Sequence, residues 1–543
     1  MLIYQGFITA VLALLLLNTL HNLRLLRAQP TPLAIDASAL VSILVPARNE
    51  ARSIARCIES LARQDYPRCE IIVLDDQSED QTAAIVEQLA SRYPNVRLLR
   101  GRALPPNWHG KAYACAQLAE AARGEWLLFV DADVMLAPQC VSVTLRWAQA
   151  QRAGLLTMVP TLLAKSFGEA VLLPTVPLTF VAVLPLGLVM HHPSPVFAGA
   201  LGQFLLFDRD TYQRIGGHAA VRMDIVEDMQ LSRLVKRHGG RVVWLDGSVL
   251  MRVRMYQSFT EAWHGIAKSA FAAINYSTPA LLPGVAICAA LFWGPYVFLA
   301  AGLLNHSTAS PALWLPLIQV TMLWIVQLLL MRRCHLPLSL AFFQAGTILA
   351  VISTVLYSAA QSNFGEGVMW KGRTYQFDVL GQSHTPSARW ATVLVVVRLL
   401  IAAALIWSGG TGAHLQVAAT LLLLGWTAAM LEFLARKGVM SQWEMWADVG
   451  GGLACLGYLQ LSGLLSLWLA LLVVLVIALC AHWLPWQAVT TMASVLPGGL
   501  LLIITETQAP NKILLGWFVL IALVASRSLA HIVIPWLQRF RSS

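Results

Sequence analysis

Two pairs of acidic residues follow hydrophobic runs that resemble the ends of buried strands. Asp131 and Asp133 are separated by one alanine directly after the run WLLFV, and Asp75 and Asp76 follow the run EIIVL. Two carboxylates at one strand end can hold a hard divalent cation, whose remaining ligands are commonly substrate phosphates. The D-x-D spacing is also common in loops, where acids serve as caps or solvated turn residues, so either pair alone does not establish a site.

The segments around these acids alternate between strand-like and helix-like patterns. The runs VSILVPA, EIIVLDD, VRLLR and WLLFVDAD read as strands, and the first intervening segment places Ile54, Ile58 and Leu61 on one face of a helix. This alternation predicts an α/β domain with a parallel sheet. Ser78 and Gln81 have the spacing of a capping box, which places the start of the second helix just after the Asp75 pair.

The expected sheet brings the two acidic pairs together. Open parallel sheets bind ligands in the crevice outside the carboxyl ends of their strands. Because Asp75, Asp76, Asp131 and Asp133 all follow strand ends, we expect them to converge on one site.

The composition places most of the 543 residues in a membrane protein. The chain is 57% hydrophobic and 12% charged, with a mean hydropathy of +0.64. A formal charge of +10 would suit nucleic acid, but basic residues beside apolar spans more often face anionic lipid headgroups, so we expect no nucleic-acid partner. The eight cysteines are scattered without a C-x-x-C pair, which favours neither a disulfide framework nor a zinc site.

The apolar runs divide the chain into segments. We expect an N-terminal transmembrane anchor whose basic flank, HNLRLLR, lies in the cytosol, then one α/β domain, then about nine to eleven crossings in total. The expected ranges are 1–23 for the anchor, 41–276 for the α/β domain, 279–360 for transmembrane helices, 361–389 for a loop containing WKGR, and 390–543 for an additional transmembrane region. The arginines in RRCH and WKGR conflict with a single crossing between them if both are cytosolic.

One apolar run interrupts the α/β domain. Residues 171–190 could span a bilayer but contain Pro174, Pro177 and Pro185. A crossing here would separate motifs that belong to one site, so we expect an interfacial or re-entrant segment. The alternative is a buried core segment, since proline-rich apolar segments also occur in protein interiors.

Six motifs in order resemble the family 2 glycosyltransferases. They are VPARNE, LDDQSEDQT, GK before a helix, DAD, GQFLLFDRDTYQRIGGH and VEDMQLSRLVKRHG, and they cover about residues 41–276. The resemblance implies a GT-A fold, a Rossmann-like α/β nucleotide-sugar domain, inserted between the N-terminal transmembrane helix and the multi-span α-helical region.

The resemblance also implies roles for individual residues. It places the nucleoside of a nucleotide-sugar donor, a UDP-hexose, near Pro46, Arg48, Glu50, Asp75 and Asp76. Lys111 would lie near the diphosphate, and Asp131 and Asp133 would hold Mg²⁺ or Mn²⁺. Asp228 would be the general base of an inverting displacement, with Glu227 as the competing candidate; either acid could instead cap the following helix.

Further motifs resemble the membrane branch that glycosylates carotenoids and other isoprenoid lipids, including its hopanoid-associated members. These are LPPNWHGKAYACAQ, RMYQSFTEAWHGIAKSAF and MWKGRTY. The Q-x-x-R-W motif of processive polysaccharide synthases is replaced by WHGIAKS, which favours addition of a single sugar. Candidate acceptor residues are Trp108, His109, Gly202, Gln203, Trp263 and Lys268, although Trp108 and His109 also suit simple packing.

The sequence therefore predicts an enzyme of the plasma or inner membrane with a cytosolic catalytic domain, a UDP-sugar donor and a lipid acceptor. Two alternatives remain: a transporter or polysaccharide-related membrane protein with a regulatory domain, and a catalytically inactive binding scaffold. Charges cluster near the predicted span ends rather than within them, which disfavours a transport pathway. The presence of every expected acid disfavours the scaffold. The sequence does not identify protein partners.

Overall fold

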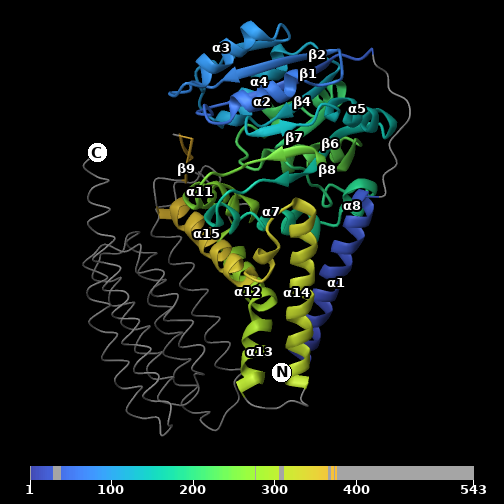
Figure 1. The fold of residues 1–543 in the computed structure, drawn as a ribbon, viewed down its shortest axis with the longest axis vertical. Coiled ribbons are helices and arrows are strands. Elements are labelled where there is room, and N and C mark those ends of the chain that lie inside the picture. Colours follow the sequence, from blue (N-terminus) through green and yellow to red (C-terminus); the bar gives the residue numbers. More distant parts are fainter. Residues whose placement is uncertain are drawn as a thin grey trace, which may run out of the picture. The chain divides into compact units, whose positions relative to one another are not determined.

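The computed structural model describes residues 2–27, 38–274, 277–304, 311–364, 368–371 and 373–375 (Figure 1). The predicted boundary at Tyr276 and the predicted region 390–543 lie outside these described residues.

An eight-stranded sheet forms the centre of the α/β domain. Its order is β3-β2-β1-β4-β7-β6-β8-β5. The strands are β1 Val41–Ala47, β2 Cys69–Asp75, β3 Val96–Arg100, β4 Trp126–Val130, β5 Val134–Leu136, β6 Ala153–Leu162, β7 Phe204–Asp208 and β8 Arg241–Val253. Strands β1 to β4 pair in parallel, as their alternation with helices predicts. The sheet as a whole is mixed rather than parallel, because β7 runs antiparallel to β4 and β6, and β5 runs antiparallel to β8.

Helices cover both faces of this sheet. One hydrophobic cluster packs the sheet against α2 (Ile54–Ala62), α3 (Thr82–Arg92) and α5 (Cys140–Ala150). Ile54, Ile58 and Leu61 are buried there, as their helical spacing predicts. The opposite face carries α4 (Gly110–Ala121), α9 (Arg209–Arg214) and α10 (Glu227–Arg237), with the short 3-10 helix η2 (Gly217–Val221). Helix α3 begins at Thr82, and Asp80 rather than Ser78 accepts the N–H of Thr82, at 2.9 Å.

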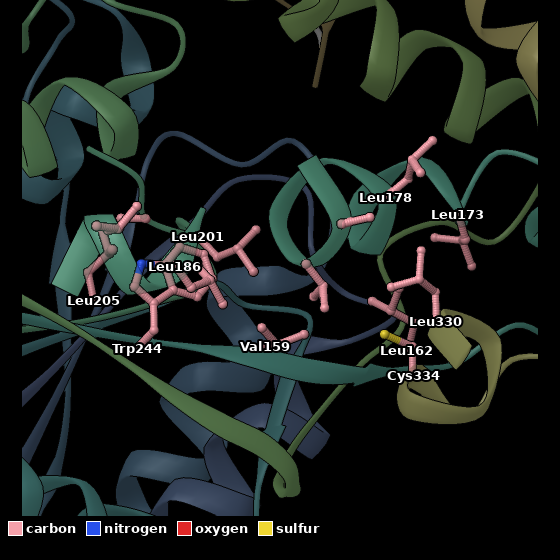
Figure 2. Packing of buried hydrophobic residues seen from close by; sticks show 14 of the residues in the cluster. Val159, Leu162, Leu173, Leu178, Leu186, Leu201, Leu205, Trp244, Leu330 and Cys334 are labelled. Carbon is pink, nitrogen blue, oxygen red and sulfur yellow. The ribbon is translucent and has the colours of Figure 1, made fainter. Parts of the chain in front are cut away.

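The core on the α4 face continues into the apolar helices. It includes α1 (Leu2–Arg27), α14 (Pro311–Cys334) and the segment 167–191. That segment folds as α6 (Phe167–Ala170), α7 (Thr175–Pro177), a π-helical turn η1 (Leu178–Val183) and α8 (Leu186–His191). Figure 2 shows Leu173, Leu178 and Leu186 among side chains of the sheet and of α14, including Trp244 and Leu330. The α/β domain therefore shares one hydrophobic core with the apolar helices.

Two asparagines of α1 satisfy the broken backbone of the 167–191 segment. Pro185 has no N–H, so it cannot donate to the carbonyl of Val181 as a regular helix requires. Asn22 Nδ2 instead donates to that carbonyl at 2.9 Å and to the carbonyl of Leu184 at 2.7 Å. Asn18, one helical turn earlier, donates to the carbonyl of Ala182 at 2.7 Å. The prolines that break this segment thus fix its contact with α1.

Two helices of the described residues are long and apolar enough to cross a membrane, Tyr4–Arg27 and Leu313–Cys334. Helices α12 (Thr278–Phe292) and α13 (Gly294–Leu304) form a pair bent by 43° that would make a third span if both belong to one. α1 and α14 contact each other, and both end at the α/β domain (Figure 1).

A short turn and one further helix follow α14 in the described residues. A short 3-10 turn η4 (Leu338–Ala341) precedes α15 (Gln344–Phe364), whose apolar part ends at Ala359 and is shorter than a span. α15 packs against α11 (Phe259–Ala270), which follows β8 and leads into the 3-10 turn η3 (Ala272–Ile274). In sequence, α15 is followed by a hairpin of β9 (Val368–Trp370) and β10 (Arg373–Tyr375), which contacts the α/β domain.

Arg333, at the end of α14, also contacts the α/β domain, through Asp246 at 2.5 Å. Arg333 of RRCH and Arg373 of WKGR therefore both contact the α/β domain, Arg333 through Asp246 and Arg373 through Asp76.

Candidate active site

The carboxyl ends of β1, β2 and β4 bring the predicted acids to one edge of the sheet. Pro46 lies near the end of β1 beside Leu74 of β2, and Arg48 and Glu50 follow β1. Asp75 ends β2, and Asp131 and Asp133 follow β4. This is the edge at which open α/β sheets bind ligands. The structure therefore brings together side chains that lie as much as 87 residues apart in sequence, from Pro46 to Asp133.

Lys111 joins the D-x-D pair to the acids at the start of α10. Its ammonium lies 2.9 Å from Asp131 Oδ1 and 3.0 Å from Glu227 Oε1. Burial opposes the charge on Lys111, but these two carboxylates outweigh it and raise the lysine pKa well above its usual value. Burial likewise opposes the charge of Glu227, and Lys111 outweighs it and lowers the pKa of that carboxyl. Both groups are therefore ionised at neutral pH.

Asp228 lies beside this ion pair in a different setting. Its Oδ2 accepts the N–H of Gly202 at 2.8 Å, and its Oδ1 accepts the N–H of Met229 at 2.8 Å. Burial, followed by the negative charge of Glu227, raises the pKa of Asp228 to about 6. The environment thus lowers the pKa of Glu227 and raises that of Asp228, although the two residues are adjacent. Such opposite shifts are typical of sites of acid–base chemistry.

Asp133 has a buried carboxylate oxygen, Oδ1, with no hydrogen-bond partner among the described residues. Burial, then the charges of Asp131 and Glu50, raises the pKa of Asp133 to about 8. In the described part of the chain, no three histidine, cysteine, aspartate or glutamate side chains are arranged so that they could hold a metal ion by themselves. The two aspartates therefore fit a divalent cation whose remaining ligands come from a substrate.

The loops after β1 and β2 are tied together by side chains from both. Arg48 donates to the carbonyls of Asp76 at 2.8 Å and Gln77 at 2.7 Å, and its Nη2 lies 3.2 Å from Glu79. Ser78 Oγ accepts the N–H of Asn49 at 3.0 Å. Arg48, which the sequence predicts to lie near the nucleoside, thus donates most of its hydrogen bonds to other protein groups. It therefore holds these two loops in position.

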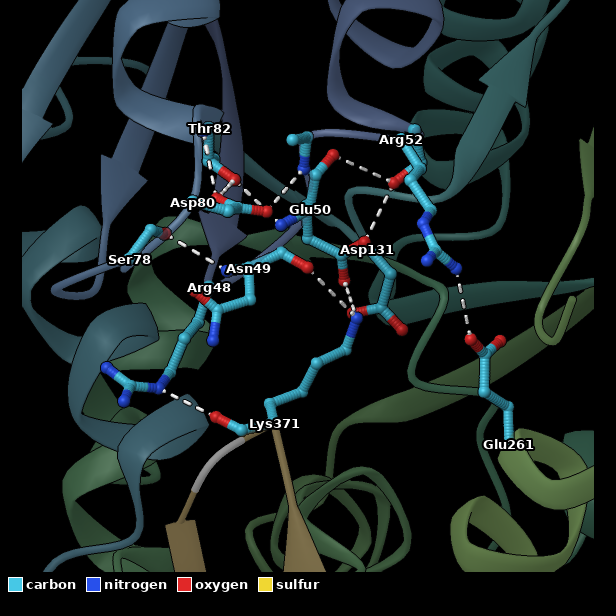
Figure 3. A network of polar contacts seen from close by, with 12 residues as sticks. Arg48, Asn49, Glu50, Arg52, Ser78, Asp80, Thr82, Asp131, Glu261 and Lys371 are labelled. Atoms are coloured by element: carbon cyan, nitrogen blue, oxygen red, sulfur yellow. Dashed lines mark hydrogen bonds and ion pairs between the residues drawn. The ribbon is translucent and has the colours of Figure 1, made fainter. Parts of the chain in front are cut away.

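The β9–β10 hairpin adds two cations that the sequence did not identify as site residues. Arg373 forms a two-pronged ion pair with Asp76, in which Nη2 lies 3.0 Å from Oδ1. Lys371 lies 3.0 Å from Glu50 Oε1, and its backbone carbonyl accepts from Arg48 Nε at 2.9 Å. Figure 3 shows the Lys371 side chain pointing toward Glu50 and Asn49. The motif MWKGRTY was the one signal for this hairpin in the sequence.

The six candidate acceptor residues fall into two groups. Gly202 and Gln203 lie at the site, since Gly202 bonds to Asp228 and the carbonyl of Gln203 accepts the N–H of Asp131 at 3.3 Å. Lys268 lies near enough to Glu227 for their charges to interact. His109 precedes α4, and burial lowers its pKa.

Two aromatic candidates are engaged in packing. The ring of Trp108 packs edge-on against Tyr113 of α4, with ring centroids 5.2 Å apart. Trp263 lies between Phe259 and Tyr357, at the contact of α11 with α15.

A pocket of about 680 Å³ opens beside Asp133 and extends to α11. Its lining combines charged and apolar side chains, among them Arg254, Glu261, Lys371, Met135 and Met255. It provides space between the D-x-D pair and the helices that contact α15.

Comparison with known proteins identifies the domain that carries this site. Residues 42–174 match the family model described as glycosyl transferase family 2. These residues form a family 2 glycosyltransferase domain. The match includes the loops after β1, β2 and β4, and therefore Arg48, Asp76, Asp131 and Asp133.

A curated relative is a 4,4'-diaponeurosporenoate glycosyltransferase of Staphylococcus aureus (strain MRSA252), which is 28% identical over 234 residues. That alignment covers 41% of this chain and 59% of the relative, so the chain spans little more than half of the relative's length. The family and the carotenoid branch expected from the motifs are both found among the relatives.

Solved structures were also compared. The mannosyltransferase PcManGT from Pyrobaculum calidifontis, in complex with GDP-Man and Mn²⁺, is 17% identical with a TM-score of 0.41, covering 66% of this chain and 98% of that one. S. aureus TarS 1–349 in complex with UDP is 16% identical with a TM-score of 0.29, covering 63% of this chain and 94% of that one.

Proposed function

We propose that this protein transfers one sugar from a UDP-hexose to a hydrophobic membrane lipid, most suitably an isoprenoid such as a carotenoid, with inversion at the anomeric carbon. The observation that carries the proposal is the meeting of the D-x-D pair, Lys111 and Asp228 at one sheet edge of a family 2 domain. Glycosyl transfer from a nucleotide diphosphate requires a general base for the acceptor and a cation for the leaving group. A buried acid with a raised pKa beside two aspartates that can bind a cation meets both requirements.

The chemistry follows from the roles of these side chains. Asp228 accepts the proton of the acceptor hydroxyl while the oxygen of that hydroxyl forms a bond to the anomeric carbon. The bond from that carbon to the diphosphate oxygen breaks, and UDP leaves on the opposite face. Asp131 and Asp133 would hold a Mg²⁺ or Mn²⁺ ion, and such an ion would stabilise the negative charge of the departing diphosphate. Glu227 keeps Lys111 charged and oriented toward Asp131.

A backbone amide keeps Asp228 in position. Gly202 donates its N–H to Asp228, and a side chain at Gly202 would meet Asp228 Oδ2 at 3.1 Å. The glycine therefore allows the base to approach the loop before β7 closely. This loop also accepts the N–H of Asp131, through Gln203, so it links the base to the D-x-D pair.

The lipid acceptor is supported by the shared core. The 167–191 segment and α14 pack directly on the sheet, so the described part of the chain holds the sheet against these apolar helices. Arg24 and Arg27 end α1, and Arg332 and Arg333 lie near the end of α14, on the side of the α/β domain. By the positive-inside rule this side is the cytosol, where nucleotide sugars are made, and the protein is integral to the plasma or inner membrane.

We further propose that α15 does not cross the bilayer. Its Thr347 hydroxyl bonds to the carbonyl of Val171 at 2.9 Å, and its Ser358 hydroxyl to the carbonyl of Ala267 at 2.5 Å, so both ends pack on the domain. This arrangement keeps Arg333 and the hairpin on the cytosolic side and removes the conflict between their positive charges.

The proposal is tested with purified, detergent-solubilised protein, labelled UDP-sugar, Mn²⁺ and extracted isoprenoid lipids. We expect label in a lipid that carries one sugar. Label confined to water-soluble products or to long polysaccharide would refute the proposal, and the second outcome would support a polysaccharide-related protein instead.

A further inference from the structure

The hairpin of β9 and β10 reaches the sheet edge from a distant part of the chain. It lies outside the residues matched by the family 2 model, and 297 residues separate Arg373 from its partner Asp76. Three links hold it there: Arg373 to Asp76, Lys371 to Glu50, and Arg48 to the backbone carbonyl of Lys371. All three partners belong to the loops after β1 and β2, which the proposed function assigns to the donor.

The backbone at this meeting point is unusual. Lys371 has a φ of 51°, and the two loop residues Asn49 and Gln77 have φ values of 54° and 56°. Non-glycine residues adopt this left-handed conformation uncommonly, and such residues concentrate at binding and catalytic sites. At the hairpin tip, this conformation accompanies a side chain that faces Glu50 (Figure 3).

The Arg373 guanidinium lies against the first residue of α4. A side chain at Gly110, the first residue of that helix, would collide with the Arg373 guanidinium. Gly110 precedes Lys111, which contacts the D-x-D pair. The N-terminal end of a helix attracts anions through its free N–H groups and its dipole, and an arginine there adds a fork of donors suited to phosphate.

The charges at the sheet edge require additional cations when a donor binds. The acids there are Glu50, Asp75, Asp76, Asp131, Asp133, Glu227 and Asp228, whereas the domain itself contributes the cations Arg48, Arg100, Lys111 and Lys268. A nucleoside diphosphate brings further negative charge to this edge. Lys371 and Arg373 supply two positive charges beside it, in addition to a divalent cation.

We propose that the hairpin forms one wall of the donor site, with Lys371 and Arg373 binding the diphosphate of the nucleotide sugar. This inference rests on the proposed function, because it assumes a nucleoside diphosphate donor. Arg373 keeps its contact with Asp76 on one edge of the guanidinium and turns the other donors toward the phosphate oxygens. Arg48 is the positioning residue that holds the hairpin against the two loops.

The test measures binding of UDP and of uridine to the full-length protein in detergent with Mn²⁺, by competition with a fluorescent UDP analogue. Charge-assisted hydrogen bonds contribute about 1.5–3 kcal/mol, so Arg373→Ala and Lys371→Ala should each weaken UDP binding about tenfold or more. Uridine lacks the diphosphate, so its binding should change less than twofold. Arg373→Lys should recover part of the loss for UDP.

Arg123→Ala is a matched control. Arg123 also pairs with a buried carboxylate, Glu70, at 3.0 Å, but it lies beside the amino end of β4 at the opposite edge of the sheet. Its removal takes a cation away from a buried acid, as Arg373→Ala does, while Glu70 keeps its hydrogen bonds from the Ser42 hydroxyl at 2.6 Å and from the backbone N–H of residue 123 at 2.7 Å. UDP binding should stay unchanged. Gly110→Ala removes no polar group but displaces the Arg373 guanidinium, so it should weaken UDP binding more than uridine binding.

Two results would overturn the inference. Equal losses for uridine and UDP would show that the hairpin acts only by positioning Asp76, and UDP binding within twofold of the parent protein in both alanine variants would show that it does not touch the donor. In both cases the parent protein binds UDP and the proposed function stands. A parent protein that binds no UDP would overturn both the inference and the proposed function.

Discussion

At the scale of single residues, Lys111 determines how the acids of the site divide their roles. It forms ion pairs with both Asp131 and Glu227, whereas Asp228 has two backbone N–H donors and a raised pKa. Asp228 is therefore the better proton acceptor of the two neighbouring acids, whereas Glu227 maintains an ion pair. The sequence left these two residues as competitors, because adjacency alone does not reveal which of them meets Lys111.

Removing either member of the D-x-D pair should abolish turnover. A bound cation contributes several kcal/mol to transition-state stabilisation, so Asp131→Asn and Asp133→Asn should each lower kcat/KM at least about 100-fold while the protein stays folded. The measurement is sugar transfer by purified variants over a range of Mn²⁺ concentrations. Asp210→Asn is the control, since this exposed acid follows β7 at the opposite edge of the sheet. Parent-like activity in either site variant would remove the assignment.

Asp228 should control the pH dependence of transfer. Burial and Glu227 raise its pKa to about 6, and only the ionised form accepts a proton, so kcat/KM should fall as the pH drops through about 6. Asp228→Asn should retain UDP binding but lose transfer about 100-fold to 10,000-fold, the usual contribution of a general base. Calorimetric titration with UDP beside a transfer assay measures both. Should Glu227→Gln lose transfer in this way while Asp228→Asn stays active, the two roles are reversed.

At the scale of elements, α1 holds the proline-broken segment in place. Asn22 is fully buried, donates to two carbonyls and accepts the N–H of Leu186 at 3.2 Å. Asn22→Ala leaves these groups unpaired and should lower the free energy of unfolding by at least about 2 kcal/mol. Denaturation in detergent measures the loss. Thr19→Ala is the control, because its hydroxyl bonds within α1, to Leu15; equal stabilities of the two variants would contradict the role of Asn22.

The elements also show how far the sequence predicts the fold. Strands β1 to β4 were predictable because each is a short apolar run and a local signal separates it from the next. The antiparallel β7 and the β9–β10 hairpin were not, since their places depend on partners far away in sequence, such as Asp76 for Arg373. The strand-end acids could be assigned to one edge from topology alone, whereas the cations of the hairpin could not.

At the scale of the whole molecule, the site and the apolar helices form one body within the described residues. The core that includes Leu155 and Trp244 of the sheet also includes Ile8 of α1 and Leu330 of α14. Composition predicted a membrane protein, but it did not predict that buried side chains of the segment 171–190, such as Leu173 and Leu186, would share this core with the sheet and these helices. This packing places the base and the D-x-D pair at a fixed distance from the apolar helices.

The central claim is that this sheet edge adds one sugar to a membrane lipid. The most direct test is mass spectrometry of lipids extracted from cells that produce either the intact protein or its Asp133→Asn variant at equal levels. The account predicts a hydrophobic lipid, most suitably an isoprenoid, heavier by one hexose, which appears with the intact protein and is absent with the variant. Identical lipid profiles in the two cell populations, or the same glycolipid in both, would contradict it.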